Sequence, residues 1–321
     1  MSQVVTRMAP SPTGKFHIGS ARTALFSYLF ARHNGGKFIL RIEDTDKERS
    51  KPEFEENIIE SFKWLGLAHD EFYRQSERTE IYKEQLKKLI DTGAAYISKE
   101  EGGEPASAEG SGEARRAEVI RFKNPNKKIK FNDVILGDIE IDSTDLKDFV
   151  IAKDLETPLY HLTVVVDDGL MNVSHVIRAQ EHIANTPRQI LILEALGFER
   201  PVYAHIPLVL APDKTKLSKR HGAVALLDYR DMGYLPEAIL NYLAFLGWNP
   251  GTEQELFTMD ELVKEFSLEK VQTGGGVFNT EKLDWYNREY IKKMSLDAQV
   301  REIKKYLDLP DELLRRALPS I

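Results

Sequence analysis

The sequence contains no cysteine among its 321 residues. This absence excludes a disulfide scaffold, a thiolate nucleophile and any zinc or iron–sulfur site with cysteine ligands. It also fits a reducing compartment, and we expect a cytoplasmic protein. No apolar run approaches the ~18 residues of a membrane span, and the opening residues lack the apolar core of a secretory signal. We therefore expect no membrane partner.

An excess of positive charge is also missing. The chain has 44 Lys and Arg residues against 51 Asp and Glu residues, which gives a net charge of −7. This excludes a globally basic binder of polyanions but leaves room for local basic patches. The composition is that of a globular protein, with 42% apolar and 30% charged residues. At roughly 150 residues per domain, the length predicts about two domains.

The first part of the chain alternates between strand and helix patterns. Residues 4–9 predict a strand, 19–33 a helix and 37–42 a second strand. A helix between two strands is typical of a βαβ unit and therefore of a parallel, Rossmann-like α/β sheet. A further helix should begin near Pro52, capped by Ser50, and end at Gly66.

The middle of the chain changes character twice. Residues 98–117 hold no large apolar side chain and predict a mobile loop. Residues 115–130 then carry seven basic side chains against one acidic one. This basic segment either contacts phosphates or forms a solvated face.

Further along, patterns of both kinds return. Residues 136–138 predict the turn of a β-hairpin, and the apolar β-branched run 162–166 predicts a strand that ends at Asp167 and Asp168. Residues 186–196 predict a helix and 202–210 a strand. After Lys219 the pattern is mainly helical.

One short motif, PSPTGKFHIGS at 10–20, follows the first predicted strand and opens a helix. The free N–H groups of that helix end would face an anion, and His17 and Ser20 could donate hydrogen bonds into the same space. The motif is not the P-loop pattern. By spacing alone, the motif is better explained as a tight loop with a capping histidine.

Two charged motifs stand beside it. KTKLSKR at 214–220 contains four cations, either a clamp for a polyphosphate or a solvated basic loop. The acidic run 43–46 ends a predicted strand, where carboxylates can take an ammonium group or ribose hydroxyls. Asp167 and Asp168 would stand in an equivalent place. For both acidic motifs, the run 43–46 and the pair Asp167 and Asp168, a simple turn with an aspartate cap is an alternative explanation.

Together these pieces resemble bacterial glutamyl-tRNA synthetases, which are class I aminoacyl-tRNA synthetases. HIGS at 17–20 resembles the HIGH signature and KLSKR at 216–220 the KMSKS signature. Longer matching blocks lie at 7–46, 164–189 and 233–250, and the resemblance covers about residues 4–295. It implies a Rossmann-like catalytic domain split by an α+β insertion and followed by a helical stem-contact domain.

The resemblance also implies roles for individual residues. ATP would lie between the signatures, with charge neutralisation by His17, Ser20, Lys216 and Lys219. The full ATP set would be Pro10, Thr13, Gly14, His17, Gly19, Ser20, Leu217, Ser218, Lys219 and Arg220. The glutamate pocket would comprise Arg7, Ser11, Glu43, Tyr160 and Arg178. Two arginines, a glutamate and a phenol match the two carboxylates and one ammonium of the amino acid.

The implied reaction has two steps. Its substrates are ATP, L-glutamate and tRNA(Glu), and Mg²⁺ is the expected cofactor. Glutamate would form glutamyl-adenylate and then pass to the terminal adenosine of the tRNA. We expect no zinc and no other protein-bound metal, because the cysteine ligands used by many relatives are absent. A monomer is expected.

The resemblance divides the chain into parts. Residues 1–75 and 161–213 would form the catalytic domain, and 76–160 the insertion that binds the tRNA acceptor end. Residues 214–295 would form the second signature loop and the stem-contact domain, and 296–321 the start of a truncated anticodon-binding domain.

Other readings stay open. A glutamyl-queuosine tRNA(Asp) synthetase is a short relative, but the block 274–291 and both signatures favour the full synthetase. Glutaminyl-tRNA synthetases carry EPNG where this chain has SPTG. A non-catalytic RNA-binding paralogue would be expected to lose pocket residues, and a small-molecule nucleotidyltransferase would not need the helical C-terminal region.

Overall fold

The computed structural model describes residues 3–99, 118–217 and 225–318. Most of the loop predicted over 98–117 and the last three residues of the second signature, Ser218, Lys219 and Arg220, lie outside these ranges.

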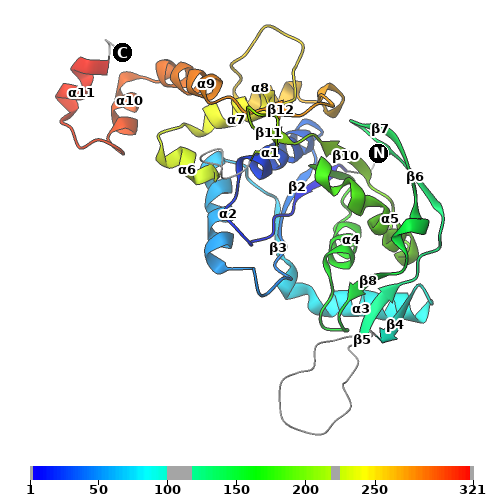
Figure 1. Ribbon diagram of the computed structural model, residues 1–321. Coiled ribbons are helices and arrows are strands. Elements are labelled where there is room, and N and C mark those ends of the chain that lie inside the picture. Colours follow the sequence, from blue (N-terminus) through cyan, green and yellow to red (C-terminus); the bar gives the residue numbers. More distant parts are fainter. Residues whose placement is uncertain (1–2, 100–117, 218–224, 319–321) are drawn as a thin grey trace, which may run out of the picture.

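Two parallel-stranded sheets form the centre of the molecule (Figure 1). The first has the order β3-β2-β1, and the second has the order β7-β6-β10-β9. In the second, only the β6–β7 pair is antiparallel. The strands are β1 (Val5–Met8), β2 (Lys37–Ile42), β3 (Glu71–Arg74), β6 (Lys128–Asp133), β7 (Gly137–Asp142), β9 (His175–Ala179) and β10 (Val202–Ile206). The predicted α/β fold with parallel strands is confirmed.

The two sheets meet along β1 and β9. Ser174 donates its backbone N–H to the carbonyl of Val5 at 3.0 Å, and the N–H of Val5 donates to Oγ of Ser174 at 2.8 Å. The strand order therefore reverses between β1 and β9. In open α/β sheets, ligands bind in the crevice at such a reversal, beyond the carboxyl ends of the strands.

Helices cover both faces of this surface. On one face lie α1 (Ile18–His33) and α2 (Pro52–Leu65), and on the other lie α3 (Thr79–Asp91), α4 (Tyr160–Leu170) and α5 (Thr186–Leu196). Strand β2 serves both cores, because Phe38, Leu40 and Ile42 point to the first and Ile39 to the second. This is the alternation that a pleated strand imposes.

Two of the sequence-based expectations fail in detail. Ser50 does not cap α2, since the N-cap is Lys51 without a side-chain hydrogen bond, and Pro52 fills the first turn. The predicted strand over 162–166 is wrong, because these residues lie in helix α4. Residues 162–168 are all buried, and an apolar run that is buried all round gives no periodicity to separate a helix from a strand.

The segment between α3 and α4 contributes to two sheets. Strands β4 (Ala95–Lys99), β5 (Glu118–Phe122) and β8 (Phe149–Ala152) form a separate antiparallel sheet. The predicted hairpin is confirmed as β6 and β7, with Gly137 at a φ of 79° where the chain turns. Because β6 also pairs parallel with β10, the hairpin extends the central sheet, and Asp133 at the end of β6 lies opposite Tyr203 of β10.

The C-terminal third is helical, as expected. The predicted strand over 202–210 splits into β10 and β11 (Val209–Leu210), and β11 pairs with β12 (Gly276–Val277). The helices are α6 (Leu226–Asp231), α7 (Pro236–Phe245), α8 (Met259–Glu265), α9 (Thr280–Lys293), α10 (Leu296–Ile303) and α11 (Asp311–Ala317).

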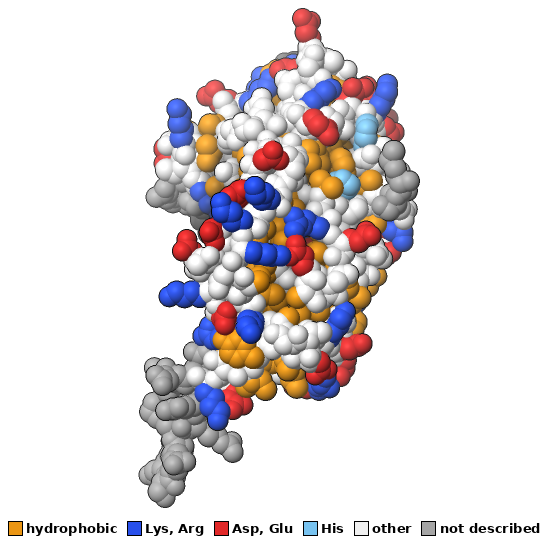
Figure 2. All heavy atoms as spheres, turned by 90° about the vertical axis from the view of Figure 1, so that its right-hand side faces the viewer, with side chains coloured by type: hydrophobic (Ala, Val, Ile, Leu, Met, Phe, Trp, Pro, Cys, Tyr) orange, Lys and Arg blue, Asp and Glu red, His pale blue; other side chains and the backbone are white. Residues whose placement is uncertain are grey.

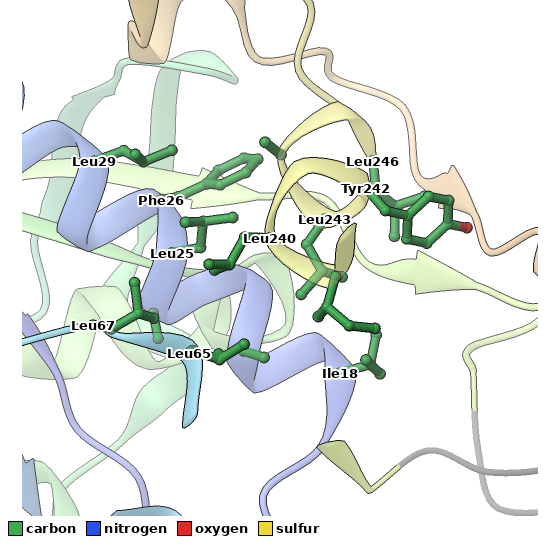
Figure 3. Close-up of a cluster of buried hydrophobic side chains, with 14 of the residues drawn as sticks. Ile18, Leu25, Phe26, Leu29, Leu65, Leu67, Leu240, Tyr242, Leu243 and Leu246 are labelled. Carbon is green, nitrogen blue, oxygen red and sulfur yellow. The ribbon is translucent and has the colours of Figure 1, made fainter. Parts of the chain in front are cut away.

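Helix α7 packs directly on α1. Figure 3 shows Leu25 and Phe26 of α1 pointing toward Leu240 and Leu243 of α7. Since these side chains belong to one buried cluster, the helix that opens with the first signature is anchored between the sheet and the C-terminal helices. Burial of each such leucine is worth roughly 1.5–3 kcal/mol.

The basic segment 115–130 is largely paired where the structure describes it. Lys128 and Lys130 share Glu140 at 2.8 and 2.7 Å, and this lowers the pKa of Glu140 to about 2. Lys127 pairs with Glu194 at 2.7 Å. Figure 2, which shows the side of the molecule with β6 and β7, has Lys and Arg side chains interspersed with Asp and Glu. Contact of this segment with tRNA stays a prediction.

Within the described ranges, no helix is both long enough and apolar enough to cross a bilayer.

Candidate active site

A large cavity lies at the reversal of strand order. Its volume is about 920 Å³, within the range of about 300–1,000 Å³ typical of ligand pockets. It opens at the carboxyl ends of β1, β9 and β10 and at the N-terminus of α1. Thirteen predicted site residues line it: Arg7, Pro10, Ser11, Thr13, Gly14, His17, Gly19, Ser20, Glu43, Tyr160, Arg178, Lys216 and Leu217.

His17 is the N-cap of α1 and faces this cavity. Its Nδ1 accepts the backbone N–H of Ser20 at 3.2 Å, and its Nε2 lies 3.1 Å from Oγ of Ser20. A Cβ on Gly19 would approach the imidazole of His17 to 3.2 Å. Glycine at this position therefore leaves room for the ring. Burial, aided by Lys216, lowers the pKa of His17. The side chain is therefore a neutral hydrogen-bonding group beside the positive end of a helix, a suitable setting for phosphate.

The described residues on either side of positions 218–224 are fixed to the same site. Leu217 donates its N–H to Val209 at 3.0 Å, and Leu226 donates to Phe16 at 2.8 Å, directly beside His17. Nζ of Lys216 lies 2.5 Å from Glu181. Ser218, Lys219 and Arg220 lie outside the described residues, and their roles stay predictions.

A buried network of charges forms the floor of the cavity. Arg7 donates to both oxygens of Asp168 at 3.2 and 3.3 Å. Arg41, which is fully buried, reaches Asp168 at 2.9 Å and Glu43 at 3.0 Å. Burial alone would raise the pKa of Asp168, but Arg7 and Arg41 hold it below its usual value. Burial raises the pKa of Glu43, against the opposing effect of Arg41.

Asp167 and Asp168 differ from the expectation that they end a strand and face a ligand. Both lie on α4, and Asp167 is buried against Arg78, Tyr82 and Gln75 at 2.7–2.9 Å. Because their oxygens are occupied by arginines and by polar side chains, these carboxylates hold the floor together. In this network the positive charges of three arginines balance the negative charges of three carboxylates. The arginines are Arg7, Arg41 and Arg78, and the carboxylates are those of Glu43, Asp167 and Asp168.

Arg178 on β9 is buried in a different way. Its guanidinium donates to Nε2 of His205 at 3.1 Å, Oε1 of Gln189 at 2.7 Å and Oγ1 of Thr186 at 2.8 Å. None of the ion pairs found among the described residues includes Arg178. Burial lowers its pKa. A buried cation without an anionic partner is costly unless a ligand supplies one.

Tyr160 and His182 stand beside Arg178 in the cavity lining. The Tyr160 hydroxyl lies 3.3 Å from Nδ1 of His182. Burial raises the pKa of Tyr160. Burial, together with the charge of Arg178, lowers the pKa of His182 to about 4. Both side chains are therefore neutral hydrogen-bonding groups near pH 7.

This histidine gives a pH prediction. The pKa of His182 falls from 6.5 to about 4 on folding, so the unfolded chain binds an additional proton between these values. Stability attributable to His182 is complete above pH 6.5 and is lost as the pH falls toward 4. Thermal unfolding across this range should show a steeper pH dependence for the native chain than for His182→Gln. Equal slopes would contradict the assignment.

Comparison with known proteins decides the family. A family model described as "tRNA synthetases class I (E and Q), catalytic domain" matches residues 3–106 and 103–285. The chain belongs to this class I synthetase family. The resemblance noted from the two signatures is thereby confirmed.

Individual members of the family agree closely with this chain. A glutamate–tRNA ligase of Aquifex aeolicus (strain VF5) is 50% identical over a 351-residue alignment, which covers 100% of this chain and 71% of the relative. One from Sulfurihydrogenibium sp. (strain YO3AOP1) is 45% identical, covering 98% and 70%. The crystal structure of a glutamate tRNA ligase from Elizabethkingia meningosepticum CCUG26117, in complex with its amino acid, has a TM-score of 0.89 at 35% identity, covering 99% of this chain and 76% of that one.

Several residues of this class I synthetase site were not found by sequence reasoning. Arg41 interrupts an apolar strand, and a buried charge in such a strand is a usable signal. The other missed residues are His182, Gln189, His205 and Asp133. His182 and Gln189 lie inside a matched block without any pattern that distinguishes them, and the meeting of Asp133 with His205 depends on the tertiary fold.

Within the described ranges, no group of three or more His, Asp or Glu side chains is arranged to hold a metal ion. The expectation about zinc stays a prediction.

Proposed function

We propose that the chain activates L-glutamate with ATP and transfers it to the terminal adenosine of tRNA(Glu). The observation that carries the glutamate assignment is the buried, anion-free Arg178 beside Tyr160 in the central cavity. The names of the relatives from Aquifex and Sulfurihydrogenibium support the same activity.

In this proposal the amino acid lies over the charged floor. Arg178 and Arg7 are the cations available to the two carboxylates, and Glu43 is the anion available to the ammonium group. Ser11 and Tyr160 add hydroxyls to the same lining. The network of paired arginines and carboxylates keeps these groups at fixed positions before substrate arrives, which is the preorganisation that catalysis by positioning requires.

ATP would occupy the part of the cavity beside His17 and Ser20. Pro10, Thr13, Gly14 and Gly19 shape this part of the lining, and Lys216 and Leu217 approach from the second signature. We assign Ser218, Lys219 and Arg220 to the same nucleotide by family resemblance. Mg²⁺ is expected to enter with the nucleotide and to neutralise its phosphates.

The chemistry needs no general base in its first step. The α-carboxylate is already ionised and attacks the α-phosphorus of ATP, forming glutamyl-adenylate and releasing pyrophosphate. His17, Ser20, Lys216 and Lys219 would stabilise the charge that moves onto the leaving pyrophosphate. In the second step, a ribose hydroxyl of the terminal adenosine attacks the acyl carbon and AMP leaves. We further propose that the chain works as a monomer in the cytoplasm.

ATP–pyrophosphate exchange tests this proposal. Exchange is measured with and without total tRNA, and glutamine serves as the control amino acid. We expect exchange that depends on glutamate. Exchange that requires both glutamate and tRNA supports the tRNA ligase, whereas exchange with glutamate alone favours the queuosine-type relative. Absence of exchange under all conditions would contradict both enzymes and favour the non-catalytic paralogue.

A further inference from the structure

The side chains around Arg178 share one property: they accept hydrogen bonds without carrying negative charge. His205, Gln189 and Thr186 accept from three different nitrogens of the guanidinium at 2.7–3.1 Å. All four residues are at most 6% exposed. By contrast, Arg7 and Arg41 on the neighbouring strands are both paired with carboxylates. The fold therefore pairs Arg7 and Arg41 with carboxylates and leaves Arg178 on neutral acceptors. Among the described residues, Arg22, the fourth buried arginine, also lacks a carboxylate partner and donates to the carbonyl of Pro207 at 2.8 Å.

Its surroundings keep the His205 ring neutral, with the unprotonated nitrogen toward Arg178. Asp133 lies 2.6 Å from Nδ1 of His205 and also accepts the backbone N–H groups of His205, Ile135 and Leu136. Since Nδ1 donates its proton to Asp133, Nε2 is left as the acceptor that faces Arg178. Burial also lowers the pKa of His205, which keeps the ring neutral.

Gln189 presents a local conflict. Its Oε1 accepts from Arg178 at 2.7 Å, but its buried Nε2 has no hydrogen-bond partner among the described residues. A glutamate here would have nearly the same shape, would remove the unpaired donor and would give Arg178 a buried salt bridge. The sequence thus has glutamine at a position where the contacts of Arg178 alone would favour a carboxylate. Such conflicts between local satisfaction and sequence are expected at functional sites.

We propose that Gln189 is a specificity-determining positioning residue, which, together with His205 and Thr186, holds Arg178 in place without neutralising it. This inference rests on the proposed function and deepens it. With the floor network balanced at three cations and three carboxylates, Arg178 adds beside it a positive charge that has no carboxylate partner. L-Glutamate carries a net charge of −1 and neutralises it, whereas L-glutamine carries none and leaves a buried cation unpaired.

The substitution Gln189→Glu tests the proposal. The new carboxylate supplies Arg178 with an internal anion, so KM for glutamate in ATP–pyrophosphate exchange should rise by at least about tenfold. The kcat should change much less, because the reacting groups are untouched. The ratio of kcat/KM for glutamate over glutamine should fall by a similar factor. An unchanged KM and an unchanged ratio would overturn the proposal.

Two further variants separate charge from structure. Gln189→Met removes the hydrogen bond without adding a charge, so it should raise KM for glutamate less than Gln189→Glu does. An equal or larger rise would mean that Gln189 acts through packing or hydrogen bonding alone and would contradict the proposal. Gln272→Glu adds the same charge at an exposed position and should leave both constants unchanged.

Failure of this inference is distinguishable from failure of the proposed function. If the native chain shows no glutamate-dependent exchange, the proposed function fails. If the native chain is active and prefers glutamate, but Gln189→Glu behaves as the native chain does, only the role of Gln189 fails. Thermal unfolding of each variant shows whether it is folded, and direct binding of L-glutamate, followed by calorimetry, gives a second readout that does not depend on ATP.

Discussion

Replacing Arg178 with alanine should lower kcat/KM for glutamate by roughly 30- to 1,000-fold, equivalent to roughly 2–4 kcal/mol. The buried guanidinium has only neutral partners, His205, Gln189 and Thr186, so the carboxylate of the substrate is the one anion expected to satisfy it. The loss should appear mainly in KM, because the interaction is made in the ground state as well as in the transition state. Exchange rates measured over a range of glutamate concentrations give both constants.

Two variants serve as controls for this prediction. Arg178→Lys keeps the charge but cannot make three directed hydrogen bonds, so it should recover only part of the loss. Arg200→Ala removes an arginine that pairs with Glu194 on the surface and should leave kcat/KM unchanged. A native KM in Arg178→Ala would remove this residue from the amino-acid pocket.

Replacing Arg41 with alanine should be the most destabilising change in the site. Arg41 is fully buried and lies within 3.6 Å of oxygens of three carboxylates, Glu43, Asp167 and Asp168. Those three carboxylates raise its pKa against the effect of burial. Removing one partner of a buried ionic network leaves uncompensated charge and costs about 3–5 kcal/mol. Thermal or denaturant unfolding, followed by circular dichroism, should show this loss.

The matched control lies on the same strand. Lys37→Ala removes a cation that pairs with Glu71 at 2.9 Å, but the two side chains are 44% and 32% exposed to solvent. Exposed pairs contribute about 0–1 kcal/mol, so Lys37→Ala should unfold close to the native midpoint. Equal destabilisation by the two substitutions would show that the buried network contributes no more than a surface pair.

Much of the fold could be predicted from local patterns. The strand over 37–42 and the helix over 186–196 have clear boundaries, because turn and capping residues flank them. Gly66 and Gly197 both end helices in the left-handed conformation, with φ of 67° and 76°. At these points local preference and tertiary structure agree, and the prediction succeeds.

Helix α4 shows where such reasoning fails. Its β-branched residues favour a strand by propensity, but the helix is buried against α3, α5, β8 and the arginines of β1 and β2. Tertiary packing therefore overrides the local preference. The error carried over to Asp167 and Asp168, which we expected to face a ligand and which instead pair with buried arginines.

The site itself could be predicted only in part. The resemblance implied sixteen site residues, of which the thirteen that the structure describes line one cavity. Gln189 and His205 were not among them, because their significance depends on the geometry around Arg178 and on a contact with Asp133 across 72 residues of sequence. No spacing rule connects positions so far apart.

Transfer of labelled glutamate to tRNA is the most direct test of the central claim. Intact tRNA(Glu) and the same tRNA without its terminal adenosine are incubated with the chain, ATP and Mg²⁺, and tRNA-bound label is counted. We predict label on the intact tRNA and none on the shortened tRNA. Label on an intact tRNA(Asp) that persists after removal of its terminal adenosine, with none on tRNA(Glu), would contradict the account and assign the chain to the base-modifying relatives.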